Sequence, residues 1–297
     1  MAHDDSDVQA AREAGVTAEV IRSFDDTPSD RLREIMTALV RHLHAFAGEV
    51  RLSQDEWQTA IHYLTDTGKI CTDTRQEFIL LSDVLGLSMR TVAMNSSADE
   101  GATESTVFGP FFVEGSGAIE RGGNLAGSVS GQPCYIRGHV CDTAGNPIAG
   151  ARIEVWEADD DGFYDVQYEN GPLQGRGHLF TDEQGGYDFW CVRPAAYPIP
   201  SDGPVGRLLD AAGRSPMRPA HVHFMVSAAG FQTLITHVFV ADGPYLDSDA
   251  VFGVKDSLIV EFEEQAPGPT PGGATLDVPW VRAEYDFVLA DLAEIGD

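Results

Sequence analysis

Two histidines that stand one residue apart are the first feature of this sequence that could do chemistry. His221 and His223 lie in an alternating segment, residues 221–226, whose pattern predicts a β-strand. Because side chains alternate between the two faces of a strand, both imidazoles should point to the same side and could bind one metal ion. Histidines are also common in protein cores and on surfaces. The pair alone therefore leaves a metal site and an ordinary strand open.

Two tyrosines in restricted surroundings are the next candidates. Tyr164 stands in the segment 161–165, and Tyr197 lies in a proline-stiffened segment, residues 195–200. A single tyrosine is more often a core aromatic residue with a hydrogen-bonded hydroxyl group. Neither tyrosine can therefore be assigned a function on its own.

The elements that must position these residues change in character near residue 105. Before it, apolar residues recur at three- and four-residue steps, which predicts helices. The predicted starts are an N-cap at residues 27–30 with Pro28 in the first helical turn, a Ser53–Glu56 capping box, and a third start at Asp73. The third predicted helix continues to Met89.

After residue 105, short alternating runs bounded by glycine and proline replace the helices. They predict strands at 135–140, 151–156, 186–190 and 221–226, with one more before residue 241. Many short strands at close spacing favour an antiparallel sandwich or barrel. The long connection 193–219 contains six prolines and is predicted to be an ordered loop with a short helix at 205–212. The expected fold class is α+β: a helical domain over residues 1–105, then an antiparallel β-sandwich catalytic domain over 106–297.

The composition excludes several classes of function. The chain has 19 Lys and Arg against 47 Asp and Glu, a formal net charge of −28, and no run of basic residues. A nucleic-acid backbone or an anionic membrane surface would repel such a protein. The acidic start does not resemble a signal peptide, and the four cysteines form no CxxC pair. We therefore expect a cytoplasmic protein with free thiols that binds neither nucleic acid nor membrane.

Taken in order, the motifs resemble those of the intradiol ring-cleavage dioxygenases. The resemblance covers about residues 105–260 and is carried by the segments 138–148, 151–156, 162–165, 193–200 and 218–224. It implies that a non-haem ferric ion, Fe(3+), is held by four residues: Tyr164, Tyr197, His221 and His223. The helical first third is similar to the linker and dimerisation domain of the catechol-type branch. That similarity implies a homodimer built through the N-terminal helices, with room for a lipid tail at its interface.

The resemblance also implies a mechanism. A phenolate is a hard, anionic donor that suits Fe(III), and two phenolates plus one hydroxide balance its charge. Such a site activates a catechol-type substrate rather than O₂, and the bond between the two hydroxylated carbons is cleaved to give a cis,cis-muconate. In this family the residue matching Tyr197 dissociates when substrate binds, and Arg218 stabilises charge that builds up on the ring. His237 stands where several catechol-type relatives have Gln, so we expect it beside the iron or its hydroxide.

The expected substrate pocket follows from the same resemblance. Its walls are Leu80, Asp83, Val107, Phe108, Gly109, Pro110, Phe111, Ile199, Pro200 and Val251. Asp83 is an acid among apolar side chains, so it should favour a substrate with a further ring hydroxyl. This resembles the hydroxyquinol (benzene-1,2,4-triol) 1,2-dioxygenases, with catechol or chlorocatechol as the alternative substrate. Gln76, Asp83 and Arg90 repeat every seven residues, however, and Asp83 could also belong to a solvated helix face.

Two other classes of function stay open at this point. The segment 138–156 also resembles prealbumin-like sandwich modules, many of which only bind other molecules. A zinc hydrolase could use the two histidines, although it normally needs a third histidine or carboxylate and a general-base Glu. The metal content and the visible spectrum would separate these possibilities.

Overall fold

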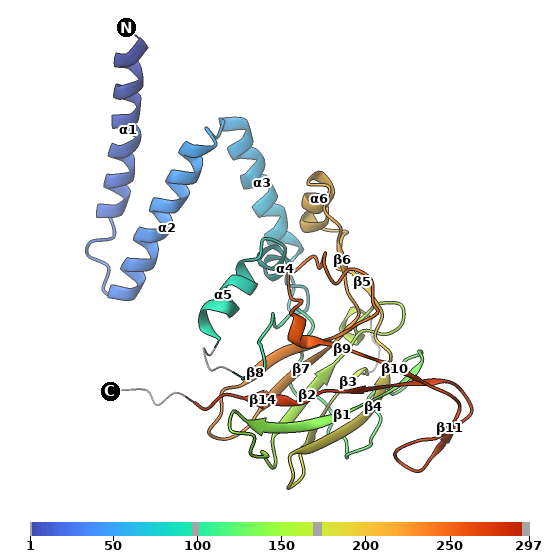
Figure 1. The fold of residues 1–297 in the computed structure, drawn as a ribbon. Helices are drawn as coiled ribbons and strands as arrows, with labels where there is room; N and C mark the ends of the chain where they lie inside the picture. The colour runs from blue at the N-terminus through green and yellow to red at the C-terminus, as the bar shows by residue number, and fades with distance from the viewer. Residues whose placement is uncertain (1, 97–100, 169–173, 293–297) are drawn as a thin grey trace. The chain divides into compact units, whose positions relative to one another are not determined.

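The computed structural model describes residues 2–96, 101–168 and 174–292 (Figure 1). The chain divides into two compact units, Met1–Thr65 and Asp66–Asp297, and each is described by itself. The first unit is helical and the second contains the strands, so the α+β class is confirmed. Among the described residues, no helix has the length and apolar character that a membrane span requires.

The first unit contains α1 (Ala2–Arg22), α2 (Asp30–Glu49) and most of α3 (Gln54–Ile70). The α2 N-cap is Ser29, whose hydroxyl accepts a hydrogen bond from the Leu32 amide, so Pro28 precedes the helix instead of lying in its first turn. The predicted capping box at the start of α3 is confirmed, because the amides of Ser53 and Glu56 each bond to the other residue's side chain. Helix α1 was not expected from the sequence.

The second unit begins with two short helices where one was predicted. They are α4 (Glu77–Val84) and α5 (Leu87–Asn95), and Gly86 between them has φ +73°. A left-handed residue ends an α-helix, which explains the break. The predicted helix in the proline-rich connection is confirmed as α6 (Pro204–Ala211), which begins with a proline.

Two five-stranded sheets form the main part of the second unit (Figure 1). One sheet has the order β10-β13-β1-β14, and β4 also pairs with β1. Its strands are β1 (Pro133–Asp142), β4 (Gly186–Val192), β10 (Glu263–Gln265), β13 (Trp280–Glu284) and β14 (Phe287–Leu289). The other has the order β3-β2-β7-β8-β9. Its strands are β2 (Arg152–Trp156), β3 (Arg176–Phe180), β7 (His221–Ser227), β8 (Leu234–Val240) and β9 (Ile259–Val260).

The inner faces of the two sheets share one buried core. It includes Ile136 and Phe189 from one sheet and Val155, Phe224 and Val238 from the other, as expected for a sandwich. The sheets are mixed rather than purely antiparallel, because β1 runs parallel to β13 and β14, and β8 runs parallel to β9. These parallel strands come from the C-terminal segment, where the sequence shows little alternation.

Short elements complete the unit and frame the site. The pair β5 (Tyr197–Pro198) and β6 (Met217–Arg218) lies in the proline-rich connection, and β11 (Gly268–Pro269) pairs with β12 (Thr275–Leu276). Single 3₁₀ turns are η1 (Asp165–Gln167) and η2 (Asp256–Leu258). In strand β7, alternate residues such as Val222 and Phe224 enter the core, which leaves His221 and His223 on the opposite face of the sheet.

Candidate functional site

The two histidines of β7 are buried and are held in the form that binds metals. The Nδ1 atom of His221 lies 2.7 Å from the Pro219 carbonyl oxygen, to which it can donate, and this leaves Nε2 with its lone pair. The Nε2 atoms of His221 and His223 are 3.3 Å apart. Burial, and then the nearby Arg218 cation, lower the pKa of His221 to about 3. Burial also lowers the pKa of His223, so both imidazoles are neutral near pH 7.

The two tyrosines meet at the same point from separate loops. Tyr164 lies on the connection between β2 and β3, and Tyr197 lies in β5. Their hydroxyl oxygens are 3.1 Å apart, and the Tyr197 oxygen is 3.4 Å from the Nε2 atom of His221. Two oxygen and two nitrogen donors therefore form one continuous buried cluster.

Burial raises the pKa of both phenols, more strongly for Tyr164. Without a cation, both hydroxyls therefore keep their protons. A bound multivalent cation reverses this preference, because it stabilises the phenolate directly. The donor set thus fits a highly charged, hard metal ion, and binding such an ion must release protons.

A third imidazole joins the cluster from the neighbouring strand. His237 pairs in register with His223, and candidate ligand atoms of His221, His223 and His237 all lie within 4.8 Å of one another. The Nδ1 atom of His237 is hydrogen-bonded to the Thr106 hydroxyl, while its Nε2 atom has no partner in the described part of the chain. Sequence reasoning placed His237 near this point but missed Thr106.

Arg218 is buried beside the four donors. It lies opposite Tyr197 in the β5–β6 pair, and its NH1 atom is 3.1 Å from the Nε2 atom of His221. Its Nε and NH2 atoms donate to the two carboxylate oxygens of Asp249 at 3.1 and 3.4 Å. Asp249 was missed because it stands alone in an irregular loop 31 residues after Arg218, where no pattern marks it.

Aromatic and ionic contacts fix the donors in place. The Trp156 ring stacks on His223 with 4.7 Å between centroids, and Phe111 stacks on Tyr164 at 4.4 Å. Next to Tyr164, the Asp165 carboxylate forms a buried ion pair with Arg176. None of Trp156, Asp165 and Arg176 was selected as a site residue from the sequence. Trp156 ends a predicted strand, and the structure pairs it directly with His223.

A small cavity adjoins the cluster, and nine of the ten expected pocket residues line it. Its walls are Leu80, Asp83, Val107, Gly109, Pro110, Phe111, Tyr197, Ile199, Pro200, Arg218, His223 and Val251. The exception is Phe108, which is partly exposed and packs against Phe112 and Trp156. Its neighbours Val107 and Gly109 face the cavity, so the intervening side chain points elsewhere.

Asp83 does not belong to a solvated helix face. Asp83 is only 2% exposed. Arg90, seven residues later in the same repeat, lies on the surface, so the two residues do not share one solvated face. Burial raises the pKa of Asp83 to about 6, and a hydrogen bond from the Ser88 side chain and then the nearby Arg218 cation partly oppose this rise. A carboxylate in this setting lacks the water it would bond to at the surface, so it gains from a donor supplied by a ligand.

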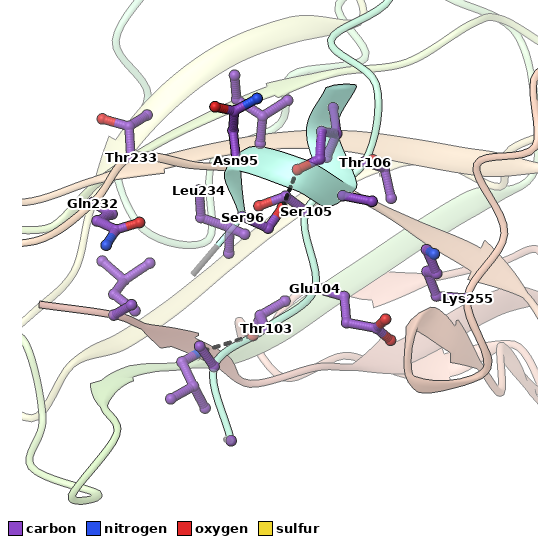
Figure 2. Close-up of a pocket in the computed structure, with 18 of the residues that line it drawn as sticks. Asn95, Ser96, Thr103, Glu104, Ser105, Thr106, Gln232, Thr233, Leu234 and Lys255 are labelled. Carbon is purple, nitrogen blue, oxygen red and sulfur yellow. Dashed lines mark hydrogen bonds between the residues drawn. The ribbon is translucent and has the colours of Figure 1, made fainter. Parts of the chain in front are cut away.

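A larger cavity of about 590 Å³ lies elsewhere in the second unit (Figure 2). It is formed by α5, residues 101–106, the start of β8 and the end of β14, and its described lining residues do not overlap with those of the small cavity. Thr106 links the two regions, since it lines the larger cavity and contacts His237. Two of the four candidate metal ligands, Tyr197 and His223, line the small cavity, so we take the small cavity as the candidate site.

Comparisons with known proteins agree with this geometry. Residues 107–291 match the family model described as "Dioxygenase", and residues 29–103 match "Catechol dioxygenase N terminus". A hydroxyquinol 1,2-dioxygenase of Nocardioides simplex is 59% identical over 95% of this chain and 97% of its own length. One from Rhodococcus opacus is 60% identical, with 95% of each chain covered. The solved structure of hydroxyquinol 1,2-dioxygenase from Pseudomonas putida DLL-E4 has a TM-score of 0.88 at 45% identity, covering 95% of this chain and 100% of that one. The chain therefore belongs to the intradiol ring-cleavage dioxygenase family, in the branch that has a catechol dioxygenase N-terminal domain.

Proposed function

We propose that this protein cleaves hydroxyquinol with O₂ between its two adjacent hydroxylated carbons, giving a hydroxy-cis,cis-muconate (maleylacetate) in the breakdown of aromatic compounds. The observation that carries the proposal is the buried Asp83 carboxylate in the same cavity wall as Tyr197, Arg218 and His223. A third ring hydroxyl would donate to this carboxylate, whereas the unsubstituted edge of catechol would place no further donor beside it. The names of the similar relatives support the same substrate.

The proposed cofactor is a ferric ion bound by Tyr164, Tyr197, His221 and His223. These residues fit it, because two neutral imidazoles and two buried phenols supply four donors in one cluster. When bound, Fe(III) would supply a strong Lewis acid that favours loss of the substrate's hydroxyl protons and a one-electron acceptor that gives the ring the radical character needed for reaction with O₂. The ionised phenolates would offset most of the ion's charge.

We propose separate tasks for several residues in and beside the small cavity. It encloses only about 10 Å³, which is room for roughly one water molecule, and Tyr197 lines it. Substrate binding therefore requires one or more walls to move. We propose that Tyr197 is the residue that moves and that its oxygen then receives a substrate hydroxyl proton. Leu80, Ile199 and Pro200 would hold the ring in the plane of reaction. The Arg218 guanidinium would stabilise negative charge that develops on the ring. His237 is proposed to bond beside the metal through its Nε2 atom.

The purified protein tests this proposal directly. We expect about one iron per chain, a visible phenolate-to-Fe(III) charge-transfer band, and a ring-opened product from hydroxyquinol with a larger kcat/KM than from catechol or 4-chlorocatechol. A larger value for either of the latter would leave the chemistry in place and overturn the substrate. A colourless, fully active zinc protein would favour a hydrolase, and a protein without metal or turnover would favour a binding module.

We also propose the wider organisation of the protein. Residues 1–105 would act as linker and dimerisation domain and 106–297 as catalytic domain, which the two family-model matches support. A homodimer through the N-terminal helices is supported by half-exposed apolar side chains on α2: Leu32, Ile35, Leu39, Leu43 and Phe46. A groove of about 930 Å³ between α1 and α2 has room for a lipid tail. The four cysteines are free thiols, as expected in the cytoplasm.

A further inference from the structure

Arg218 is placed near two buried carboxylates and is bonded to only one of them. Its guanidinium forms two hydrogen bonds with Asp249, and both side chains are almost fully buried. Asp83 lies in the wall of the same cavity and also feels the Arg218 charge. Since a buried carboxylate without a balancing positive charge is costly, each of the two acids would gain from binding the single cation.

The loop that carries Asp249 is fixed independently of Arg218. The Asp249 carboxylate accepts the amides of Val251 and Gly253 at 3.3 and 2.9 Å. The Ala250 amide donates to the Met217 carbonyl, one residue before Arg218, and Arg214 donates to the Ala250 carbonyl. Asp249 is thus anchored by backbone contacts before it binds the guanidinium.

The space around this ion pair leaves little freedom. A Cβ atom on Gly253 would lie 3.2 Å from both the NH2 atom of Arg218 and the Oδ2 atom of Asp249, so a glycine allows the backbone to pack against the pair. Val251, two residues after Asp249, lines the substrate cavity. The same loop therefore holds the arginine and forms part of the substrate wall.

We propose that Asp249 is a positioning residue that holds Arg218 toward Tyr197 and His221 and keeps it off Asp83. The proposal rests on the function proposed above and deepens it. Without the Asp249 charge, the guanidinium would turn to the remaining buried carboxylate, Asp83. One substitution would then remove two functions together, namely charge stabilisation at the ring and acceptance of the third substrate hydroxyl.

The test compares Asp249→Asn with Asp249→Glu in the iron-containing, full-length protein. Asparagine keeps an oxygen for one of the two loop amides, which bond to different carboxylate oxygens, and it loses the charge. Glutamate keeps the charge and both oxygens on a longer side chain. Asp247→Asn is the matched control, because it removes an exposed acid two residues away. The measurements are the anaerobic binding of hydroxyquinol and catechol, followed by the visible spectrum, and the decay of each substrate complex on mixing with O₂, expressed per bound iron.

We expect Asp249→Asn to slow the decay of both substrate complexes about ten- to a hundredfold, with partial recovery in Asp249→Glu and no change in Asp247→Asn. Anaerobic catechol binding should change little, while hydroxyquinol binding weakens because Asp83 is occupied. Decay rates per iron equal to those of the wild type would overturn the proposal. So would an equal effect in the Asp247→Asn control.

A double-mutant cycle tests the competition itself. If Arg218 turns to Asp83 in Asp249→Asn, adding Asp83→Ala should reduce hydroxyquinol selectivity no further, so the two effects are strongly non-additive. Additive effects would contradict the competition. Thermal unfolding of the metal-free variants distinguishes a positioning role of Asp249 from a purely structural one. A purely structural role would lower Tm without changing the decay rate per iron. Failure of the wild type to bind iron or cleave hydroxyquinol would instead refute the proposed function.

Discussion

At the scale of single residues, the two phenols of the cluster have different surroundings. Tyr164 is stacked on Phe111 and directly precedes Asp165, which forms a buried ion pair with Arg176. Tyr197 lies in a two-residue strand, lines the small cavity and faces the Arg218 charge, which lowers its pKa against the effect of burial. The place in the cavity wall and the neighbouring cation both suit a ligand that exchanges, whereas the stacked position of Tyr164 suits a permanent one.

The first prediction separates these two tyrosines. Tyr164→Phe should lose the iron or nearly all activity, because a ligand that stays bound throughout is removed. Tyr197→Phe should retain more iron, since this residue has only to leave and to receive a proton. Iron content and the visible band of the purified variants measure the difference. A coloured, active Tyr164→Phe beside a metal-free Tyr197→Phe would reverse the two roles.

The second prediction concerns the carboxylate in the cavity wall. Asp83→Ala removes a charged acceptor, and hydrogen bonds to charged groups contribute about 1.5–3 kcal/mol. The kcat/KM for hydroxyquinol should therefore fall roughly ten- to a hundredfold relative to that for catechol. The ratio of the two substrates is decisive, because a folding defect would lower both together. A ratio that stays within about twofold of the wild type would make catechol the better candidate substrate.

The third prediction follows from the raised pKa of Asp83, about 6 against an ordinary value of 3.8. Between these values the folded protein binds more protons than the unfolded chain, so the Asp83 contribution to stability falls as the pH rises through about 6. An asparagine in its place does not ionise. The Tm of metal-free Asp83→Asn relative to the wild type should therefore increase from pH 4 to pH 7, and a difference independent of pH would show that the carboxyl group is not destabilised by burial.

At the scale of elements, the site depends on loops that meet over the outer face of one sheet. Gly162, two residues before Tyr164, has φ +84°, and a Cβ atom there would lie 2.4 Å from the Cβ atom of Tyr197. The two tyrosine-bearing loops can approach each other only because this residue has no side chain.

The fourth prediction tests that approach. Gly162→Ala should separate the two loops and lower iron content and activity together, by about tenfold or more as expected for a sub-ångström misplacement of reacting groups. Gly145→Ala is the matched control, because Gly145 also has φ +84° but a Cβ there meets nothing within 4 Å. Gly145→Ala introduces the same backbone strain, so this variant should lose stability but keep its iron content and its activity per iron. Equal iron content in both variants would refute the contact argument.

Elements with a clear period could be predicted from the sequence, and isolated contacts could not. The alternation along β7 placed both histidines on one face, because that face is opposite a fully apolar one. The break at Gly86 was missed because helical periodicity continues across it. Strand β3 was missed because its sequence, residues 176–180, has no clear alternation of apolar and polar side chains. Thr106 contacts His237, which is 131 residues away in the sequence, and Asp249 contacts Arg218, which is 31 residues away. No local sequence pattern encodes contacts between such distant residues. The ligand set came from the ordered motifs of a known family rather than from spacing.

At the scale of the whole molecule, the formal net charge of −28 constrains what can enter and leave. An uncharged aromatic triol approaches such a protein without electrostatic penalty, whereas a ring-opened dicarboxylate is repelled by the overall field. The charge therefore favours product release over product retention, and this effect should weaken as salt screens the field.

The last prediction concerns assembly through the first unit. Helix α2 presents five large apolar side chains that are about half exposed, a larger continuous apolar stripe than an isolated surface helix normally leaves in water. If two copies pair through this stripe, Leu39→Glu combined with Leu43→Glu should bury unpaired charges at the interface and convert a dimer into a monomer. Sedimentation velocity at micromolar concentration measures the change. Leu292→Glu is the control, because it places the same charge at an exposed leucine of the second unit and should leave the dimer intact. A wild-type protein that sediments as a monomer would contradict the dimer, and a double variant that stays dimeric would place the interface elsewhere.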